Sequence, residues 1–131
     1  MSDPGDPTAG TVYAAVGGQR FFDELVDHFY RGVRDDPVLR PMYVDDDLTE
    51  ARRHLAGFLA QYWGGPPAYS AERGHPRLRM RHAPFPIDPA ARDAWLAHMT
   101  EAVRAMAPPA EIERAMLEYF AMAADHLVNQ A

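Results

Sequence analysis

The spacing of apolar residues constrains the fold of this chain more than any other feature. Four segments, 19–34, 48–63, 88–106 and 110–128, repeat apolar residues every three or four positions, as a helix with one buried face does. No segment shows the apolar–polar alternation of a strand. Breaks rich in proline or glycine separate the segments, namely Asp36-Pro37, Gly64-Gly65-Pro66-Pro67 and Pro108-Pro109, and such residues end or interrupt helices. The sequence therefore predicts an all-α fold.

The spacing and the residues that flank it predict where two of the helices start and which residues are buried. The helix at 48–63 is expected to follow an N-cap at Asp47, and Glu50 would complete a capping box. Asp88-Pro89 is a strong helix start for the third segment. The residues expected to be buried in the second helix are Leu48, Leu55, Phe58, Leu59 and Tyr62.

Shorter elements complete the predicted organisation. We expect single turns at 12–16 and 38–43, an irregular loop over 64–76, and a short helix at 77–82 that Pro76 opens. Residues 1–11 hold two Asp-Pro pairs and two glycines without apolar periodicity, which indicates a disordered leader. Residues 12–131 are expected to form one domain.

Composition excludes several classes of protein. The chain has no cysteine, so disulfides, zinc fingers, iron–sulfur clusters and thiol nucleophiles are ruled out. Lysine is also absent, and all 13 basic residues are arginines. The net charge of −6 argues against a nucleic-acid binder. No apolar run is long enough to span a membrane and no signal peptide is evident, so we expect a cytoplasmic protein.

His82 differs from the other histidines of the chain. His28, His54, His98 and His126 lie in predicted helices among charged residues, and we interpret them as structural. His82 ends the short predicted helix, where arginines and apolar residues alternate. A histidine that binds an iron porphyrin needs this mixture of apolar contacts and cations. A histidine at a helix end is more often structural, so the pattern alone leaves both interpretations open.

Aromatic residues give a second indication. Tyr30, Tyr43, Tyr62, Trp63 and Trp95 place O–H or N–H donors on or beside apolar helix faces. Buried tyrosines and tryptophans need hydrogen-bond partners. These donors could converge on a small polar ligand in an apolar cavity, or each could be an ordinary aromatic at the edge of the core.

Several extended motifs, in order along 12–129, resemble those of the group II truncated haemoglobins, close to the bacterial haemoglobin O type. The start of the chain contributes VGG at 16–18, FY at 29–30, Tyr43 and DDDL at 45–48. The middle contributes FLAQYWGGP at 58–66, YS at 69–70 and RGHPRLRMRHAPF at 73–85. RDAWL at 92–96 and MAA at 122–124 complete the match.

This resemblance implies a two-over-two helical sandwich that encloses one haem b, iron protoporphyrin IX. His82 is then the proximal ligand of the iron. Arg79 and Arg81 are candidates for contacts with the haem propionates, and Arg81 is the stronger candidate. The residues that would pack against the porphyrin are Leu55, Phe58, Met80 and Phe85.

On the opposite side of the haem, the resemblance assigns Tyr30, Tyr43 and Trp95 to the distal site. Tyr30 and Trp95 would hold the ligand and Tyr43 would orient it. Ala51 falls where many globins place a distal histidine. Each hydrogen bond to a charged ligand contributes roughly 1.5–3 kcal/mol. Two such bonds would slow oxygen release by roughly a hundredfold or more, if most of the effect is on the off-rate.

The leading functional hypothesis is a haem protein that binds O2, NO or CO and performs redox chemistry, either nitric oxide dioxygenation or peroxidase-like turnover of peroxide. Turnover needs an external reductase, because the chain has no flavin or nicotinamide domain. One alternative is oxygen storage, delivery or sensing without turnover. Another is a haem-free helical module whose surface around His82 binds a partner. The sequence leaves homo-oligomer formation open.

Overall fold

The computed structural model describes residues 10–43, 48–66 and 87–128, and within these ranges every regular element is a helix. The prediction of an all-α fold is therefore confirmed. Predicted helix boundaries agree with the observed ones to within one residue at most ends. The elements are α1 (Val12–Ala15), α2 (Gln19–Arg34), the 3-10 helix η1 (Arg40–Met42), α3 (Thr49–Tyr62), α6 (Pro89–Met106) and α7 (Ala110–Leu127).

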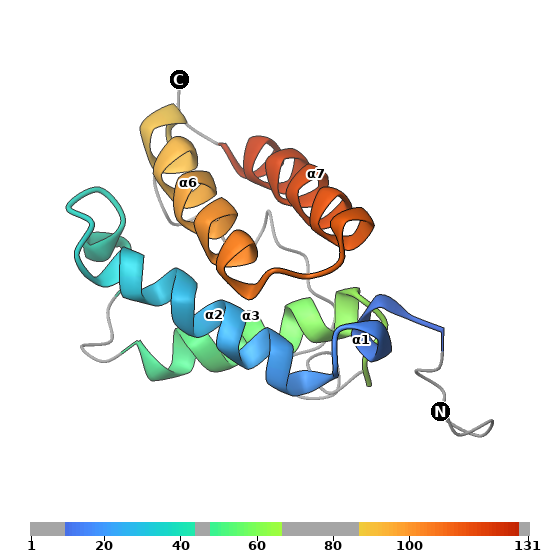
Figure 1. Cartoon of the computed structure of the whole chain (residues 1–131). Helices are drawn as coiled ribbons and strands as arrows, with labels where there is room; N and C mark the ends of the chain where they lie inside the picture. Colours follow the sequence, from blue (N-terminus) through green and yellow to red (C-terminus); the bar gives the residue numbers. More distant parts are fainter. Residues whose placement is uncertain (1–9, 44–47, 67–86, 129–131) are drawn as a thin grey trace.

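The long helices form two crossed pairs. In Figure 1, α2 and α3 lie together as one layer, and α6 and α7 cross over them side by side as the other. Contacts of α2 with α3 and of α6 with α7 build the two layers, and contacts of α2 with α6 join them. This arrangement is the expected two-over-two helical sandwich. Its core runs along the face of α2 that meets both neighbours, and Phe22, Leu25 and Phe29 there are fully buried.

The observed helix starts test the N-caps that the sequence predicts. Asp88 caps α6 as predicted, and its carboxylate accepts a hydrogen bond from the backbone N–H of Ala91 at 2.8 Å. The prediction for α3 was wrong by one residue. Leu48 occupies the N-cap position in a left-handed conformation (φ 61°) without a side-chain cap, while Asp47 lies outside the described residues. Leu48 is 1% exposed, so we attribute the shifted start to burial of its side chain in the core.

Two further expectations need correction. Thr11, assigned to the leader, is the N-cap of α1 and accepts a hydrogen bond from the N–H of Ala14; the rest of that segment up to residue 9 lies outside the described residues. Tyr62, expected in the core, is 49% exposed. Its ring stacks on Tyr119 of α7, with ring centroids 4.1 Å apart, so one face of the ring is covered although the side chain reaches the surface.

Among the helices of the described ranges, none is both long enough and apolar enough to cross a lipid bilayer.

Candidate functional site

A cavity of about 140 Å³ lies where η1, the first turns of α6 and the last turns of α7 meet. Most of its lining is aliphatic, and the polar groups on its wall belong to Tyr43, Arg92 and Trp95. Such a combination of an apolar wall and a few polar groups is typical of small-molecule and cofactor sites. The described lining consists of Leu39, Met42, Tyr43, Ile87, Ala91, Arg92, Trp95, Ala124 and Leu127.

Tyr30 and Tyr43 form a pair beside this cavity. Their rings meet edge to face with centroids 5.5 Å apart, and Tyr30 is only 3% exposed. Burial raises the pKa of Tyr30 well above the usual range, and the neighbouring Tyr43 raises it further. Burial also raises the pKa of Tyr43. Both side chains therefore keep their protons at neutral pH.

Phe29 connects this pair to Trp95. Its ring lies 4.9 Å from that of Tyr30 and 5.4 Å from that of Trp95, measured between centroids. The three residues assigned to the distal site by resemblance are thus gathered in one region. Tyr43 and Trp95 line the cavity, whereas Tyr30 contacts Tyr43 and is absent from the described lining.

The turn that carries Tyr43 is fixed by Asp36. One carboxylate oxygen accepts hydrogen bonds from the backbone N–H groups of Val38 at 2.8 Å and Leu39 at 3.2 Å. The other lies 2.7 Å from Nε2 of His98. The bond to His98, followed by the backbone bond from Val38, lowers the pKa of Asp36. Arg40 closes the turn by donating from Nη1 to the backbone oxygen of Tyr43 at 3.0 Å.

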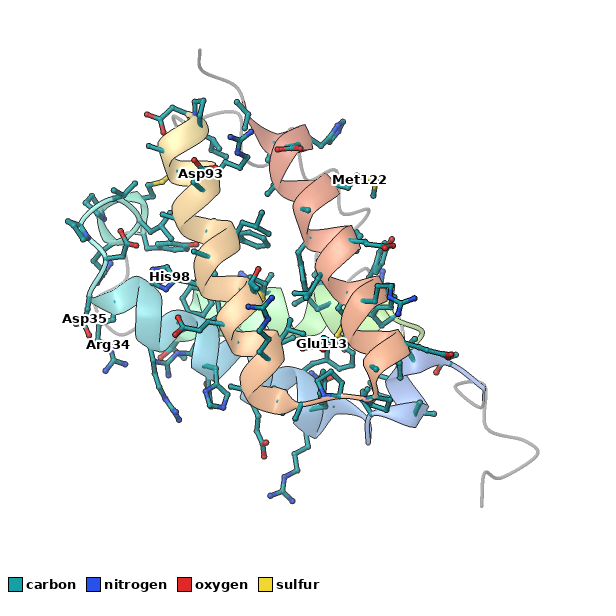
Figure 2. All side chains as sticks on the ribbon, turned by 45° about the horizontal axis from the view of Figure 1, so that its top comes forward. Arg34, Asp35, Asp93, His98, Glu113 and Met122 are labelled. Atoms are coloured by element: carbon teal, nitrogen blue, oxygen red, sulfur yellow. The ribbon has the colours of Figure 1, made fainter. Side chains whose placement is uncertain are left out.

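His98 reaches this carboxylate from α6, across the end of α2. In Figure 2 its ring lies between the two helices, on the side where Asp35 ends α2. Gly32 makes room for the ring, because a Cβ at position 32 would lie 2.9 Å from Cε1 of His98 and still closer to Nδ1. Gly32, Asp36 and His98 together join α6 to the turn that presents Tyr43.

The remaining predicted site residues are not in the described cavity wall. Leu55 is half-buried on α3 and Phe58 is buried beside Tyr62, with ring centroids 6.2 Å apart. Neither is part of the described lining. Ala51 is half-buried near the start of α3. The predicted proximal ligand His82, together with Arg79, Met80, Arg81 and Phe85, lies outside the described residues.

Sequence reasoning missed Asp36 and His98. Asp36-Pro37 was interpreted only as the end of a helix, although an aspartate at such a point often accepts hydrogen bonds from the next backbone N–H groups. This local signal could have been found in the sequence. The contact of Asp36 with His98 could not, because 62 positions separate the two residues and only the crossing of α2 and α6 brings them together.

The residues of the cavity fit a haem. The porphyrin ring needs apolar walls, and a diatomic ligand needs a few donors on one side. Leu39, Met42, Ile87 and Leu127 supply apolar surface, and Tyr43 and Trp95 bring hydrogen-bonding side chains to the same wall. Arg92 at the wall donates to Asp125 of α7 at 3.0 Å and so ties α6 to α7 beside the cavity.

Comparison with known proteins agrees with this fit. Residues 11–129 match the bacterial-like globin family. The chain is 43% identical to the group 2 truncated hemoglobin YjbI of Bacillus subtilis (strain 168) over 90% of this chain and 88% of that protein. Its structure resembles that of a thermostable hemoglobin from Thermobifida fusca, with a TM-score of 0.89, 54% identity and coverage of 91% and 97% of the two chains.

A truncated oxygen-avid haemoglobin from Bacillus subtilis is also similar, with a TM-score of 0.86, 42% identity and coverage of 92% of this chain and 100% of that one. The match to the family model spans nearly the whole chain, and the similarity to YjbI covers most of both proteins. The chain therefore belongs to the bacterial-like globins and, within them, to the haem-binding group II truncated haemoglobins.

Proposed function

We propose that this globin carries haem b, with His82 as the proximal ligand, and holds O2, NO or CO with Tyr43 and Trp95. The haem supplies the iron atom to which such a ligand binds. The observation that carries the proposal is the presence of Tyr43 and Trp95 on the wall of one otherwise apolar cavity. Away from water, each hydrogen bond to a ligand is electrostatically stronger.

The pairing of the tyrosines supports a division of roles that reverses the expectation from the sequence. The ring of Tyr30 packs edge to face on that of Tyr43, and Tyr30 is not part of the described cavity wall. In this proposal Tyr43 and Trp95 hold the ligand, and Tyr30 fixes the position of the Tyr43 ring.

We further propose that the protein performs redox chemistry rather than oxygen delivery. Two donors on one ligand slow its release by roughly a hundredfold, at roughly 1.5–3 kcal/mol for each bond. A protein that releases oxygen so slowly is a poor carrier, and the related Bacillus subtilis protein is described as oxygen-avid. Nitric oxide dioxygenation, with electrons from an external reductase, is the reaction that slow release favours.

Haem binding is tested by the visible absorption spectrum of the purified protein when oxidised, reduced, and reduced with carbon monoxide. We expect a haem spectrum that shifts with carbon monoxide and that His82→Ala abolishes. The matched control is His126→Ala, because His126 is exposed in the last turn of α7. Loss of haem in the control, or retention of an unchanged spectrum in His82→Ala, would contradict the assignment of His82.

Turnover is tested by nitric oxide consumption with a reductase present. We expect consumption to continue through many equivalents of nitric oxide per haem. Consumption that stops after one equivalent would show a binding protein, which favours storage, delivery or sensing.

A further inference from the structure

The two donors proposed to hold the ligand come from different elements of the fold. Trp95 lies on α6, whereas Tyr43 directly follows η1, in the turn that continues from the end of α2. A hydrogen bond weakens steeply once its donor is displaced or tilted. Both donors can therefore serve one ligand only if the turn and α6 are held at a fixed separation, so the contacts that join the turn to α6 are important for ligand binding.

One such contact is the pair formed by Asp36 and His98. Nε2 of His98 lies 2.7 Å from Oδ2 of Asp36, and the lowered pKa of Asp36 keeps this carboxylate ionised at neutral pH. An ionised carboxylate can only accept hydrogen bonds, so Nε2 of His98 is the donor. The side chains of Asp36 and His98 are 15% and 22% exposed, which limits the screening of their interaction by salt.

His98 is placed by the same part of α6 that carries Trp95. The two residues are three positions apart, so they lie on one face of the helix in successive turns. Phe29 and Gly32 have the same spacing on α2. Phe29 contacts Trp95 with ring centroids 5.4 Å apart, and Gly32 leaves the space that the ring of His98 fills. The ring of His98 is therefore held between the two helices, facing Asp36.

On the other side of the pair, hydrogen bonds lead from Asp36 to Tyr43 without interruption. Oδ1 of Asp36 accepts from the backbone N–H groups of Val38 and Leu39. The backbone oxygen of Asp36 accepts from the N–H of Arg40 at 2.9 Å, and the backbone oxygen of Arg40 accepts from the N–H of Tyr43 at 3.2 Å. A displacement of Asp36 is therefore passed on to Tyr43 through the turn.

We propose that Asp36 and His98 are positioning residues for ligand binding, and that their pair fixes Tyr43 relative to Trp95 so that both donors reach the same ligand. Neither Asp36 nor His98 is part of the described cavity wall, so both act through Tyr43. The proposal rests on the proposed function, because it needs Tyr43 to bind the ligand. It differs from a role in stability alone, since breaking the pair should speed ligand release from a protein that is still folded.

The test measures oxygen dissociation from the reduced, haem-loaded protein by stopped-flow mixing with carbon monoxide. We expect Asp36→Ala to release oxygen several-fold faster than the parent, up to about tenfold, the factor that one lost hydrogen bond gives. In a Tyr43→Phe background the same substitution should no longer change the rate. An equal acceleration in both backgrounds would show that Asp36 does not act through Tyr43. The matched control is Asp35→Ala, which removes an exposed neighbouring carboxylate and should release oxygen at the parent rate.

Two variants of His98 test the other partner and do not depend on the folding of Asp36→Ala. His98→Gln keeps a side-chain N–H within reach of Asp36, whereas His98→Leu keeps only an apolar group of similar bulk. We expect His98→Leu to release oxygen as fast as Asp36→Ala and His98→Gln to restore a rate near that of the parent. Equal acceleration in both variants would assign the effect to packing against Gly32 and overturn the role of the bond.

The stretching frequency of bound carbon monoxide gives a second readout, which a loss of stability alone does not move. The C–O bond strengthens when a donor near its oxygen is lost. We therefore expect the frequency to rise in Asp36→Ala and in His98→Leu, toward the value in Tyr43→Phe. An unchanged frequency in both variants would contradict a displaced Tyr43.

The outcomes separate this inference from the proposed function. A protein without a haem spectrum overturns both, and so does a Tyr43→Phe variant that releases oxygen at the parent rate. If Tyr43→Phe accelerates release while Asp36→Ala and His98→Leu do not, the positioning role alone is overturned.

Discussion

The contacts of α2 with α6 and of α3 with α7 are both built from aromatic rings, yet their surroundings differ. At the first, Phe29 lies between Tyr30 and Trp95, away from water. At the second, Tyr62 stacks on Tyr119 with nearly half of its side chain exposed. The same residue type is thus buried away from water at one contact and reaches the surface at the other. Burial decides which chemistry a tyrosine supports.

The largest effect is expected where the two contacts meet. Phe120 is buried and touches both Trp95 and Tyr119. We expect Phe120→Ala to lower the free energy of unfolding by about 3–5 kcal/mol, the usual cost of removing a buried ring. Tyr62→Ala should cost only about 1–2 kcal/mol, because nearly half of this side chain already lies in water although it contacts three rings, those of Phe58, Trp63 and Tyr119. Urea unfolding of both variants measures the difference. Equal losses in the free energy of unfolding would show that burial does not distinguish the two contacts.

The next effect tests the fit between α2 and α6. A methyl group at Gly32 would collide with the ring of His98. We expect Gly32→Ala to destabilise the parent, because overpacking costs typically about 1–3 kcal/mol. In a His98→Ala background the collision is absent, and the same substitution should stabilise the protein by up to roughly 1 kcal/mol through helix propensity. A double-mutant cycle measures this change of sign, and additive effects would contradict the packing.

Alkaline pH tests the burial of the phenols at both contacts. Burial raises the pKa values of Tyr30 and Tyr43 and raises that of Tyr119 to about 12. Since the unfolded phenols ionise near pH 10, stability is fully present below about pH 10 and falls as pH rises toward the folded pKa values. Tyr30→Phe should make this loss shallower, as measured by unfolding at several alkaline pH values. A loss of unchanged steepness in that variant would contradict the burial of Tyr30.

Acid pH gives the smallest expected effect and concerns the α2–α6 contact alone. The pKa of Asp36 is lowered, chiefly by the bond to His98. Its contribution to stability is therefore present above the unfolded pKa of about 3.9 and is lost as pH falls below that value. We expect Asp36→Asn to lower Tm at neutral pH and to reduce the further decrease in acid. The matched control is Asp35→Asn, because Asp35 is exposed beside it (Figure 2).

The sequence predicted elements that depend on neighbours along the chain. Asp88-Pro89 marked the start of α6, and the spacing of Phe22, Leu25 and Phe29 marked the buried face of α2. Features that depend on the crossing of helices were not predictable in this way. Tyr62 stacks on Tyr119 only because α7 lies beside the end of α3, and Asp36 meets His98 only after α2 and α6 have crossed.

The candidate site likewise combines residues that the sequence could identify with contacts that depend on how the helices pack. Tyr30, Tyr43 and Trp95 were selected by resemblance, and the structure gathers them beside one cavity. The edge-to-face contact of Tyr30 with Tyr43 followed from no sequence pattern, and Tyr43 rather than Tyr30 lies on the described cavity wall. The assignments of His82 and of the arginines near it remain predictions.

The rate of oxygen dissociation from the reduced protein tests the central claim most directly. We expect the double variant Tyr43→Phe with Trp95→Phe to release oxygen roughly a hundredfold faster than the parent, the loss of two hydrogen bonds of roughly 1.5 kcal/mol each. Tyr13→Phe, which lies outside both aromatic contacts, should release oxygen at the parent rate. An unchanged rate in the double variant would contradict the assignment of Tyr43 and Trp95 as the groups that hold the ligand.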